Sequence, residues 1–259
     1  MTTTLAETIS RLPFAPATLQ PGHVWLAGAG PGGIGCLTLD VAHALGQADA
    51  VVYDALVDPA LLEAAPDAAL HFVGKRGGVP SPKQAEINAL LVDLARQGRR
   101  VLRLKGGDPN MFGRGGEEAL ALVEAGVPFR FLAGVTSALG ALADARIPAT
   151  MRGLNKAIVF ATGHSADDEL DWAALARTGQ PIVVYMGMSN IERITGALVA
   201  GGLSATTPAA VIMSATTPDE TILVATLGGL AARVRAEAVG APALIVVGDI
   251  VALRERLLP

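Results

Sequence analysis

Short apolar runs alternate with helical segments through the first half of the chain, and this alternation constrains the fold most strongly. The runs have the length of buried strands, and the segments between them carry apolar residues at helical spacing. They cover residues 24–27, 50–53, 70–73, 101–104 and 128–132. Strands that alternate with helices favour a parallel sheet with helices on both faces. The sequence therefore predicts an α/β fold.

The same pattern restarts in the second half of the chain. Further strand-like runs cover residues 157–160, 182–185, 209–213, 221–224 and 243–247. Helices are expected at 189–200 and 227–238, and an Ala- and Leu-rich helix ends near Ile147. We therefore expect two α/β halves that meet near Gly134, each with a mostly parallel sheet flanked by helices. The predicted division is a loosely held N-terminal arm at 1–21, an N-terminal domain at 22–134 and a C-terminal domain at 135–259.

The composition excludes several classes of protein. Of the 259 residues, 51% are hydrophobic and 17% are charged, which argues against disorder. No apolar run reaches membrane-spanning length, and the first residues lack the pattern of a secretion signal. The single cysteine, Cys36, is expected to be a small packing residue in a cytoplasmic protein. The four histidines show no metal-ligand spacing, so no metal is predicted.

Charge is distributed unevenly along the chain. The net charge of −4 does not favour general binding of nucleic acid. From His71 to Lys156, however, 13 Lys and Arg residues stand against 7 Asp and Glu residues. A locally basic segment of this kind serves an anionic ligand or forms a solvated face, and both interpretations remain open.

A long loop at residues 105–118 follows the predicted strand 101–104. It reads Lys-Gly-Gly-Asp-Pro-Asn-Met-Phe-Gly-Arg-Gly-Gly-Glu-Glu, and its glycines and proline make it a loop shaped by backbone. Open α/β sheets bind their ligands at such strand ends. Its polar side chains, Asp108, Arg114, Glu117 and Glu118, either face a ligand or are solvated charges of a turn.

The turn after the first strand allows a rival interpretation. Gly28, Gly30 and Gly33 have the G-x-G-x-x-G spacing of a dinucleotide site, and Asp54 follows at the distance of a ribose-binding carboxylate. By spacing alone, the chain would be an NAD-dependent oxidoreductase. Pro31 argues against this, because it removes a backbone N–H from the turn that would hold the pyrophosphate.

Eight motifs, taken together and in order, are more specific than the glycine turn. They are Gly28-Ala-Gly-Pro-Gly32, Tyr53-Asp-Ala-Leu-Val57, Val73-Gly-Lys-Arg76, Arg103-Leu-Lys-Gly-Gly-Asp-Pro109, Phe112-Gly-Arg-Gly-Gly-Glu-Glu118, Gly134-Val-Thr-Ser137, Thr162-Gly-His164 and Tyr185-Met-Gly187. With them the sequence resembles the tetrapyrrole methyltransferases, from about residue 23 to 257.

The resemblance implies a fold, a cofactor and a reaction. The fold is a two-domain α/β arrangement with the active site in the cleft between domains, and the protein is a homodimer. The methyl donor is S-adenosylmethionine, which leaves as S-adenosylhomocysteine. The reaction is methylation of two pyrrole carbons of uroporphyrinogen III to give precorrin-2, the precursor of sirohaem and cobalamin. Methylation of another precorrin is the nearest alternative, and a non-catalytic binding relative is another.

The resemblance also assigns roles to individual residues. Asp54 and Lys75 match a proton acceptor and donor, while Arg114 and Glu117 match positions for substrate binding and proton removal. Arg114 and Glu117 are also spaced for a local ion pair. The positions that match the binding site of the methyl donor are Pro31, Gly106, Gly107, Asp108, Met111, Thr136, Ser137, Met186 and Ala215.

Four positions depart from the usual pattern of the family. They are Gly33, Asn110, Ala133 and Met151, where the family has Asp, Phe, Pro and His. The departures lie in loops that face ligands, so they bear on the choice of substrate and on the rate rather than on the fold.

Overall fold

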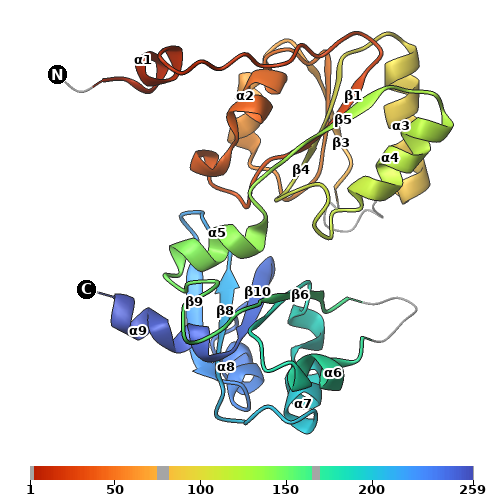
Figure 1. Ribbon diagram of the computed structural model, residues 1–259. Helices are drawn as coiled ribbons and strands as arrows, with labels where there is room; N and C mark the ends of the chain where they lie inside the picture. Colours follow the sequence, from red (N-terminus) through yellow and green to blue (C-terminus); the bar gives the residue numbers. More distant parts are fainter. Residues whose placement is uncertain (1–2, 75–81, 165–169, 259) are drawn as a thin grey trace.

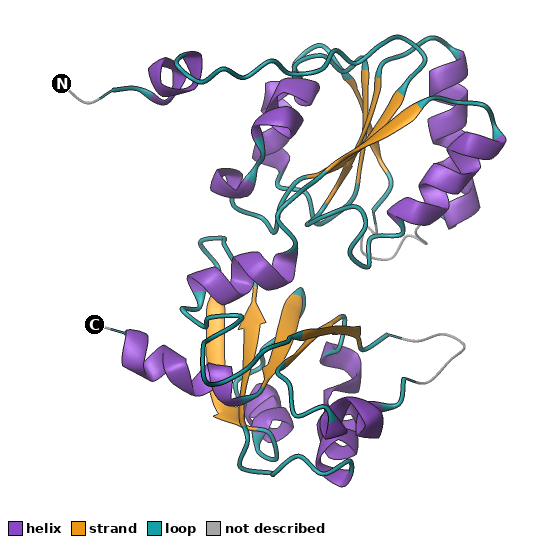
Figure 2. Cartoon of the chain, in the orientation of Figure 1, coloured by secondary structure: helices purple, strands orange, loops and turns teal. Residues whose placement is uncertain are grey.

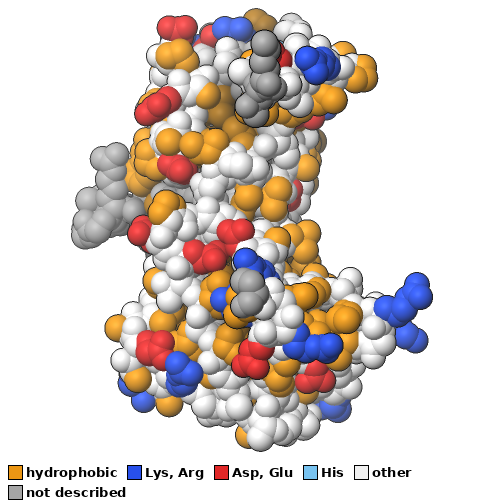
Figure 3. Space-filling model, turned by 90° about the vertical axis from the view of Figure 1, so that its left-hand side faces the viewer, with side chains coloured by type: hydrophobic (Ala, Val, Ile, Leu, Met, Phe, Trp, Pro, Cys, Tyr) orange, Lys and Arg blue, Asp and Glu red, His pale blue; other side chains and the backbone are white. Residues whose placement is uncertain are grey.

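The computed structural model describes residues 3–74, 82–164 and 170–258, and Lys75 lies outside them. The chain forms two α/β domains, each built on a five-stranded sheet, and they are stacked end to end (Figure 1). The space-filling outline narrows between the two lobes (Figure 3). Among the described helices, none is both long and apolar enough to span a membrane.

The first sheet has the strand order β3-β2-β4-β1-β5. Its strands are β1 (Val24–Gly28), β2 (Ala50–Tyr53), β3 (Ala69–Phe72), β4 (Val101–Lys105) and β5 (Phe129–Leu132). Every neighbouring pair is parallel. The prediction of a parallel sheet is therefore confirmed for this half, and all five carboxyl ends lie at the same edge.

Helices cover both faces of the first sheet (Figure 2). Helix α2 (Leu39–Leu45) and the 3₁₀ helix η2 (Pro59–Ala64) pack on one face, against side chains such as Leu102. Helices α3 (Gln84–Arg96) and α4 (Gly115–Glu124) pack on the other face, against Val101 and its neighbours. Because successive residues of a strand point to opposite faces, the apolar run of β4 supplies both cores.

The second sheet has the order β6-β7-β10-β8-β9. Its strands are β6 (Val159–Thr162), β7 (Ile182–Tyr185), β8 (Pro208–Met213), β9 (Thr221–Thr226) and β10 (Ala243–Val247). Only β6 and β7 pair in parallel, while the pairs with β8 and β10 are antiparallel. The prediction that this sheet is mostly parallel is wrong. The seven residues between β8 and β9 are too few for the crossover that parallel strands need.

Helices α6 (Trp172–Arg177), α7 (Ile191–Ala200) and α8 (Leu230–Ala236) cover one face of the second sheet. Helix α5 (Ser137–Asp144) and the 3₁₀ helix η4 (Asp249–Ala252) cover the other, and α9 (Leu253–Leu257) follows η4. Two short 3₁₀ helices, η1 (Ile34–Cys36) and η3 (Met188–Asn190), follow β1 and β7. Helix α5 lies between the two sheets, where the domains meet (Figure 1).

The N-terminal segment projects from the first domain (Figure 1). Its helix α1 (Leu5–Ser10) buries no residue, although a capping box between Thr4 and Glu7 closes its first turn. Ala17 packs against the first core, and Leu19 is buried in it and donates its backbone N–H to Gln47, so the segment joins the core at these residues.

Candidate active site

Three glycines bring the ends of β1, β4 and β5 into contact. A Cβ on Gly28 would lie 2.5 Å from the carbonyl oxygen of Gly107 and 2.6 Å from the Cα of Gly134. A Cβ on Gly134 would lie 2.2 Å from the same carbonyl oxygen. Any side chain at these positions would push the strand ends apart, so backbone forms this part of the site.

Three backbone amides of the glycine turn, those of Ala29, Gly30 and Gly33, are already engaged. Ala29 donates to the carbonyl of Lys105 at 2.7 Å, and Gly30 and Gly107 exchange hydrogen bonds of 3.1 and 2.6 Å. Gly33 donates to Thr216 Oγ1 at 2.9 Å. Because these amides already have partners and a proline has none to offer, the turn is a poor cradle for a pyrophosphate. The geometry does not favour the NAD interpretation.

A cavity of about 840 Å³ lies between the two domains. This volume is in the range of small-molecule sites. The N-terminal domain contributes the glycine turn, the loop after β2 and the start of the loop after β4. The C-terminal domain contributes the ends of β7 and β8 and the segment before β10. Six predicted donor-binding residues line the cavity, namely Pro31, Gly106, Gly107, Ser137, Met186 and Ala215.

The C-terminal wall of the cavity holds residues in an unfavourable backbone conformation. The lining residues Met186 and Ser214 have φ angles of 52° and 49°, and Thr216, next to the lining residues Ala215 and Thr217, has 67°, all in the left-handed region. Non-glycine residues at such angles cluster at functional sites, because the surrounding structure must hold them there. Met186 is 50% exposed at the end of β7, so its side chain faces the cavity rather than the core.

Tyr185 of the second domain contacts the loop at residues 105–118 of the first domain. Its hydroxyl lies 2.6 Å from Thr136 Oγ1 and accepts the backbone N–H of Ala138 at 3.0 Å. Burial raises the pKa of the Tyr185 phenol. The ring of Phe112 lies 4.9 Å from the Tyr185 ring, and Met111 packs against the same core. The predicted donor positions Met111 and Thr136 therefore lie behind the cavity wall.

The Asp108 carboxylate forms hydrogen bonds with two loops, the loop after β4 and the loop after β5. Its Oδ2 accepts the backbone N–H of Gly134 at 3.0 Å, and its Oδ1 accepts that of Asn110 at 2.8 Å. The carboxylate therefore joins the loop after β4 to the loop after β5, next to the bridge between Gly30 and Gly107. Asn110, where the family has Phe, makes its contact through backbone and is exposed.

A buried charge cluster lies under the start of α4. Oε1 of Glu118, which is fully buried, accepts from Arg103 Nε at 3.1 Å and Lys105 Nζ at 2.8 Å. Arg103 also lies 3.7 Å from Asp54 at the end of β2. Burial and the neighbouring Arg103 lower the pKa of Lys105, and Glu118 opposes both effects. Oε2 of Glu118 is buried without a described hydrogen-bond partner.

Arg114 and Glu117 form an exposed bidentate ion pair. Arg114 Nε and Nη2 donate to the two carboxylate oxygens at 2.8 and 2.6 Å. Their side chains are 55% and 52% exposed, at the start of α4. The hydrogen bonds from Arg114 lower the pKa of the Glu117 carboxyl. Arg114 itself has a φ of 60°, which is unusual for a residue other than glycine.

Sequence reasoning left several cavity residues unassigned. They include Leu56, Asp58, His164, Tyr185, Ser214, Thr217, Asp219 and Leu244. Tyr185 and His164 belong to motifs on which the resemblance to the family is based, so their positions in those motifs could have indicated that they line the site. Thr217 and Asp219 lie between β8 and β9, and nothing in the sequence connects that turn with the glycine turn.

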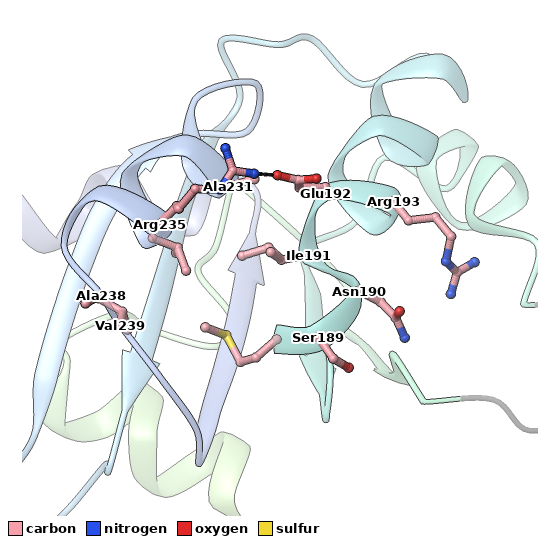
Figure 4. Close-up of a pocket in the computed structure, with 11 residues that line it drawn as sticks. Ser189, Asn190, Ile191, Glu192, Arg193, Ala231, Arg235, Ala238 and Val239 are labelled. Atoms are coloured by element: carbon pink, nitrogen blue, oxygen red, sulfur yellow. Dashed lines mark ion pairs between the residues drawn. The ribbon is translucent and has the colours of Figure 1, made fainter.

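A second cavity of about 570 Å³ lies in the C-terminal domain. Figure 4 shows Glu192 of α7 and Arg235 of α8 facing each other there, and the two side chains form an ion pair. Met188 and Ser189 of η3 line both cavities. Within the described ranges, no group of His, Cys, Asp and Glu side chains is arranged to hold a metal.

Comparison with known proteins gives relatives over most of the chain. The chain is 52% identical to a uroporphyrinogen-III C-methyltransferase of a Sinorhizobium species, over 92% of this chain and 87% of that protein. It is 50% identical to siroheme synthase 2 of Aeromonas hydrophila, over 92% of this chain and 51% of that protein. The chain thus spans about half the length of the siroheme synthases it matches.

Solved structures share the fold. A uroporphyrin-III C-methyltransferase from Thermus thermophilus, complexed with S-adenyl homocysteine, superposes with a TM-score of 0.77 at 37% identity, over 89% of this chain and 99% of that one. A cobalt precorrin-4 methyltransferase superposes with a TM-score of 0.80 at 26% identity, over 89% and 96%. The family profile of the tetrapyrrole (corrin/porphyrin) methylases matches residues 23–231. The chain belongs to the tetrapyrrole (corrin/porphyrin) methylase family.

Proposed function

We propose that the chain is an S-adenosylmethionine-dependent methyltransferase that methylates two pyrrole carbons of uroporphyrinogen III to give precorrin-2. One observation carries the proposal. The cavity of about 840 Å³ lies between the domains of a chain that is 52% identical to a uroporphyrinogen-III C-methyltransferase over most of both proteins. The product would serve the synthesis of sirohaem or cobalamin.

The cavity suits a compact donor with apolar and polar parts. Ile212, Leu244 and Met186 provide apolar surface, and Ser137 and Thr217 provide hydroxyl groups. S-Adenosylmethionine would supply a methyl group on a positively charged sulfur. A Cβ on Gly106 would lie 2.6 Å from the Cβ of Leu56, so glycine here leaves room for the Leu56 side chain in the cavity wall.

Catalysis by this site would consist mainly of orientation. Holding a donor and a pyrrole carbon in line in a cleft that excludes water accounts for a large share of the rate of such a transfer. A proton must leave the macrocycle after methylation, and Asp54 is the acceptor we propose. Its Oδ1 accepts the backbone N–H of Leu56, a cavity residue, at 3.0 Å. Arg103 lies near its Oδ2. Lys75, outside the described residues, is the proposed proton donor.

The Arg114–Glu117 pair offers a way to couple substrate binding to base strength. Uroporphyrinogen III carries carboxylates, and an arginine binds a carboxylate in bidentate fashion. A substrate carboxylate that takes Arg114 would release Glu117, since the same donors hold both. The pKa of Glu117 would then rise, because Arg114 is the main cause of its lowering. Glu117 would become a stronger base only when substrate is bound.

We also propose a homodimer and the division into residues 1–21, 22–134 and 135–259. Helix α1 has only six residues and buries none, and so short a helix is not stable alone in water. Exposed apolar side chains lie on this arm and on the second domain, including Leu5, Leu12, Phe14, Leu139, Met151 and Leu154. Contact with a second copy would cover such side chains. A monomer mass by light scattering at micromolar concentration would rule the dimer out.

Methylation of a different precorrin is the second candidate. It is favoured by the TM-score of 0.80 with a cobalt precorrin-4 methyltransferase, although the identity is only 26%. The 37% and 52% identities with uroporphyrin-III enzymes favour the first candidate. Incubation of the protein with S-adenosylmethionine and each tetrapyrrole, followed by absorbance, separates the two.

Calorimetric titration tests the ligand class directly. S-Adenosylhomocysteine should bind to the purified protein, while NAD at the same concentrations should give only heats of dilution. Binding of NAD with no response to S-adenosylhomocysteine would refute the proposed function. The sharper variant test is Met186→Ala, which removes apolar surface from the cavity wall and should weaken S-adenosylhomocysteine binding without creating a site for NAD.

A further inference from the structure

The glycine turn of the first domain touches the turn after β8 of the second domain at the edge of the interdomain cavity. The Gly33 backbone N–H of the first domain donates to Thr216 Oγ1 of the second at 2.9 Å. A Cβ on Gly33 would lie 2.5 Å from the carbonyl oxygen of Thr216. A Cβ on Gly32 would lie 2.6 Å from Cγ2 of Thr217. We call this contact, formed by Gly32, Gly33, Thr216 and Thr217, the clasp.

Glycine at position 33 is needed for space and not for conformation. Its φ of −68° and ψ of 136° are extended values that any residue adopts. A larger residue would therefore fit the chain locally but would collide with backbone from the other domain. The absence of a side chain lets the domains approach each other at this place.

Thr216 is held in place from both domains. Its φ of 67° is rare for a β-branched residue, so its surroundings must maintain it. Its backbone N–H donates to Glu220 Oε2 at 3.0 Å within the second domain, and its hydroxyl accepts from Gly33 across the cleft. Opening the domains would remove the second contact while leaving the first.

Helix α5 packs against both sides of the clasp at Gly140. A Cβ on Gly140 would lie 2.6 Å from Cγ of Pro31 and 3.4 Å from Cγ2 of Thr216. The glycine turn and the turn after β8 therefore rest side by side on the same spot of α5. Gly32, Gly33 and Gly140, from two separate segments, make room for the clasp.

The clasp borders the proposed donor site. Pro31 and Gly32 line the cavity on one side, and Ser214, Ala215 and Thr217 line it on the other. We propose that the clasp fixes the separation of these two walls and controls how fast S-adenosylhomocysteine leaves the cavity. This inference rests on the proposed function, because it takes that ligand as the occupant.

Two alanine variants in one loop test the clasp. Gly33→Ala places a methyl group against Thr216, whereas Gly35→Ala adds the same methyl group where no atom lies within 4 Å. Stopped-flow displacement of S-adenosylhomocysteine should give a dissociation rate about ten-fold higher for Gly33→Ala and an unchanged rate for Gly35→Ala. Thr216→Val, which keeps the shape and removes the acceptor oxygen, should raise the rate about five-fold.

Hydrogen exchange without ligand gives an independent measurement. Peptides that cover residues 29–36 and 212–220 should both exchange faster in Gly33→Ala than in Gly35→Ala. Equal exchange, or equal dissociation rates in Gly33→Ala, Thr216→Val and wild type, would overturn the proposal. If wild-type protein does not bind S-adenosylhomocysteine at all, the proposed function fails, while the exchange result still decides whether the clasp holds the domains together.

Discussion

Replacement of Glu118 by glutamine tests the buried charge cluster under α4. Glu118→Gln keeps the shape of the side chain and removes its charge. Arg103 and Lys105, which are 3% and 4% exposed, would then lack their nearest anion. The remaining carboxylate, that of Asp54, lies 3.7 Å from Arg103 and is not within reach to replace both contacts. The folded state would hold two buried cations with the Asp54 carboxylate near only one of them.

The size of the effect follows from this burial. Removing one partner of a buried ion pair costs about 3–5 kcal/mol, and the neutral amide oxygen of glutamine can still accept hydrogen bonds, so we expect about 3 kcal/mol. For a chain of this length that loss lowers Tm by about 6–12 °C. Glu117→Gln is the matched control, because the exposed neighbouring pair contributes at most about 1 kcal/mol. Urea denaturation and calorimetry measure both variants.

The effect of Glu118→Gln should depend on pH. Burial lowers the pKa of Lys105 below its value in the unfolded chain, and loss of Glu118 lowers it further. A lysine with a lowered pKa in the folded state costs stability at neutral pH, and the cost fades as pH rises through that pKa. The deficit relative to wild type should therefore shrink as the pH is raised from neutral towards 10.5, the ordinary pKa of a lysine side chain. A variant as stable as Glu117→Gln at every pH would refute this reasoning.

Three further outcomes are expected. The hydrogen bond from Arg100 lowers the pKa of Asp49 from 3.8 to about 2. Asp49→Asn should therefore lower the free energy of unfolding by about 1 kcal/mol above pH 4. On acidification through about pH 2, the variant should lose less of its free energy of unfolding than wild type, as measured by urea denaturation at each pH. In separate titrations of the two ligands, Arg114→Ala should weaken tetrapyrrole binding about 10- to 100-fold and leave S-adenosylhomocysteine affinity unchanged, and Arg114→Lys should be intermediate. Loss of binding of both ligands in parallel would contradict the role of Arg114 in binding the tetrapyrrole. Gly107→Ala, at a φ of 69°, should lower S-adenosylhomocysteine affinity by calorimetry, whereas Gly116→Ala, with no atom within 4 Å, should not.

The first sheet could be predicted because its signals are local. Each apolar run is followed by a glycine-rich or polar turn and then by a helical segment, which fixes strand, connection and direction together. The second sheet was predicted incorrectly because strand direction depends on pairing between distant segments. The sequence did contain one clue, since residues 214–220 between β8 and β9 leave no room for a helix.

The buried cluster shows why side-chain environment was harder to predict. Glu117 and Glu118 are adjacent in the sequence, yet the first is half exposed and the second is fully buried. One step along a helix changes the direction of a side chain by about 100°, so only the position of the sheet under α4 separates them. Arg103 and Lys105 are two positions apart in the apolar strand β4, so their side chains point to the same face of the sheet. This spacing was the signal in the sequence that predicts charged groups on one buried face.

The clasp depends on a contact between residues that are 183 positions apart in the chain. The spacing of Gly33 in the sequence matches a dinucleotide motif. A glycine that is required for space cannot be distinguished, from the sequence alone, from a glycine that is required for its backbone conformation. Its extended backbone and the short approach to Thr216 make that distinction only in three dimensions.

Methyl counting by mass spectrometry tests the central claim most directly. The protein would be incubated anaerobically with uroporphyrinogen III and S-adenosylmethionine that carries a labelled methyl group. Our account predicts a tetrapyrrole product with two labelled methyl groups, formed together with S-adenosylhomocysteine. An unlabelled tetrapyrrole after incubation with folded protein that binds S-adenosylhomocysteine would contradict it.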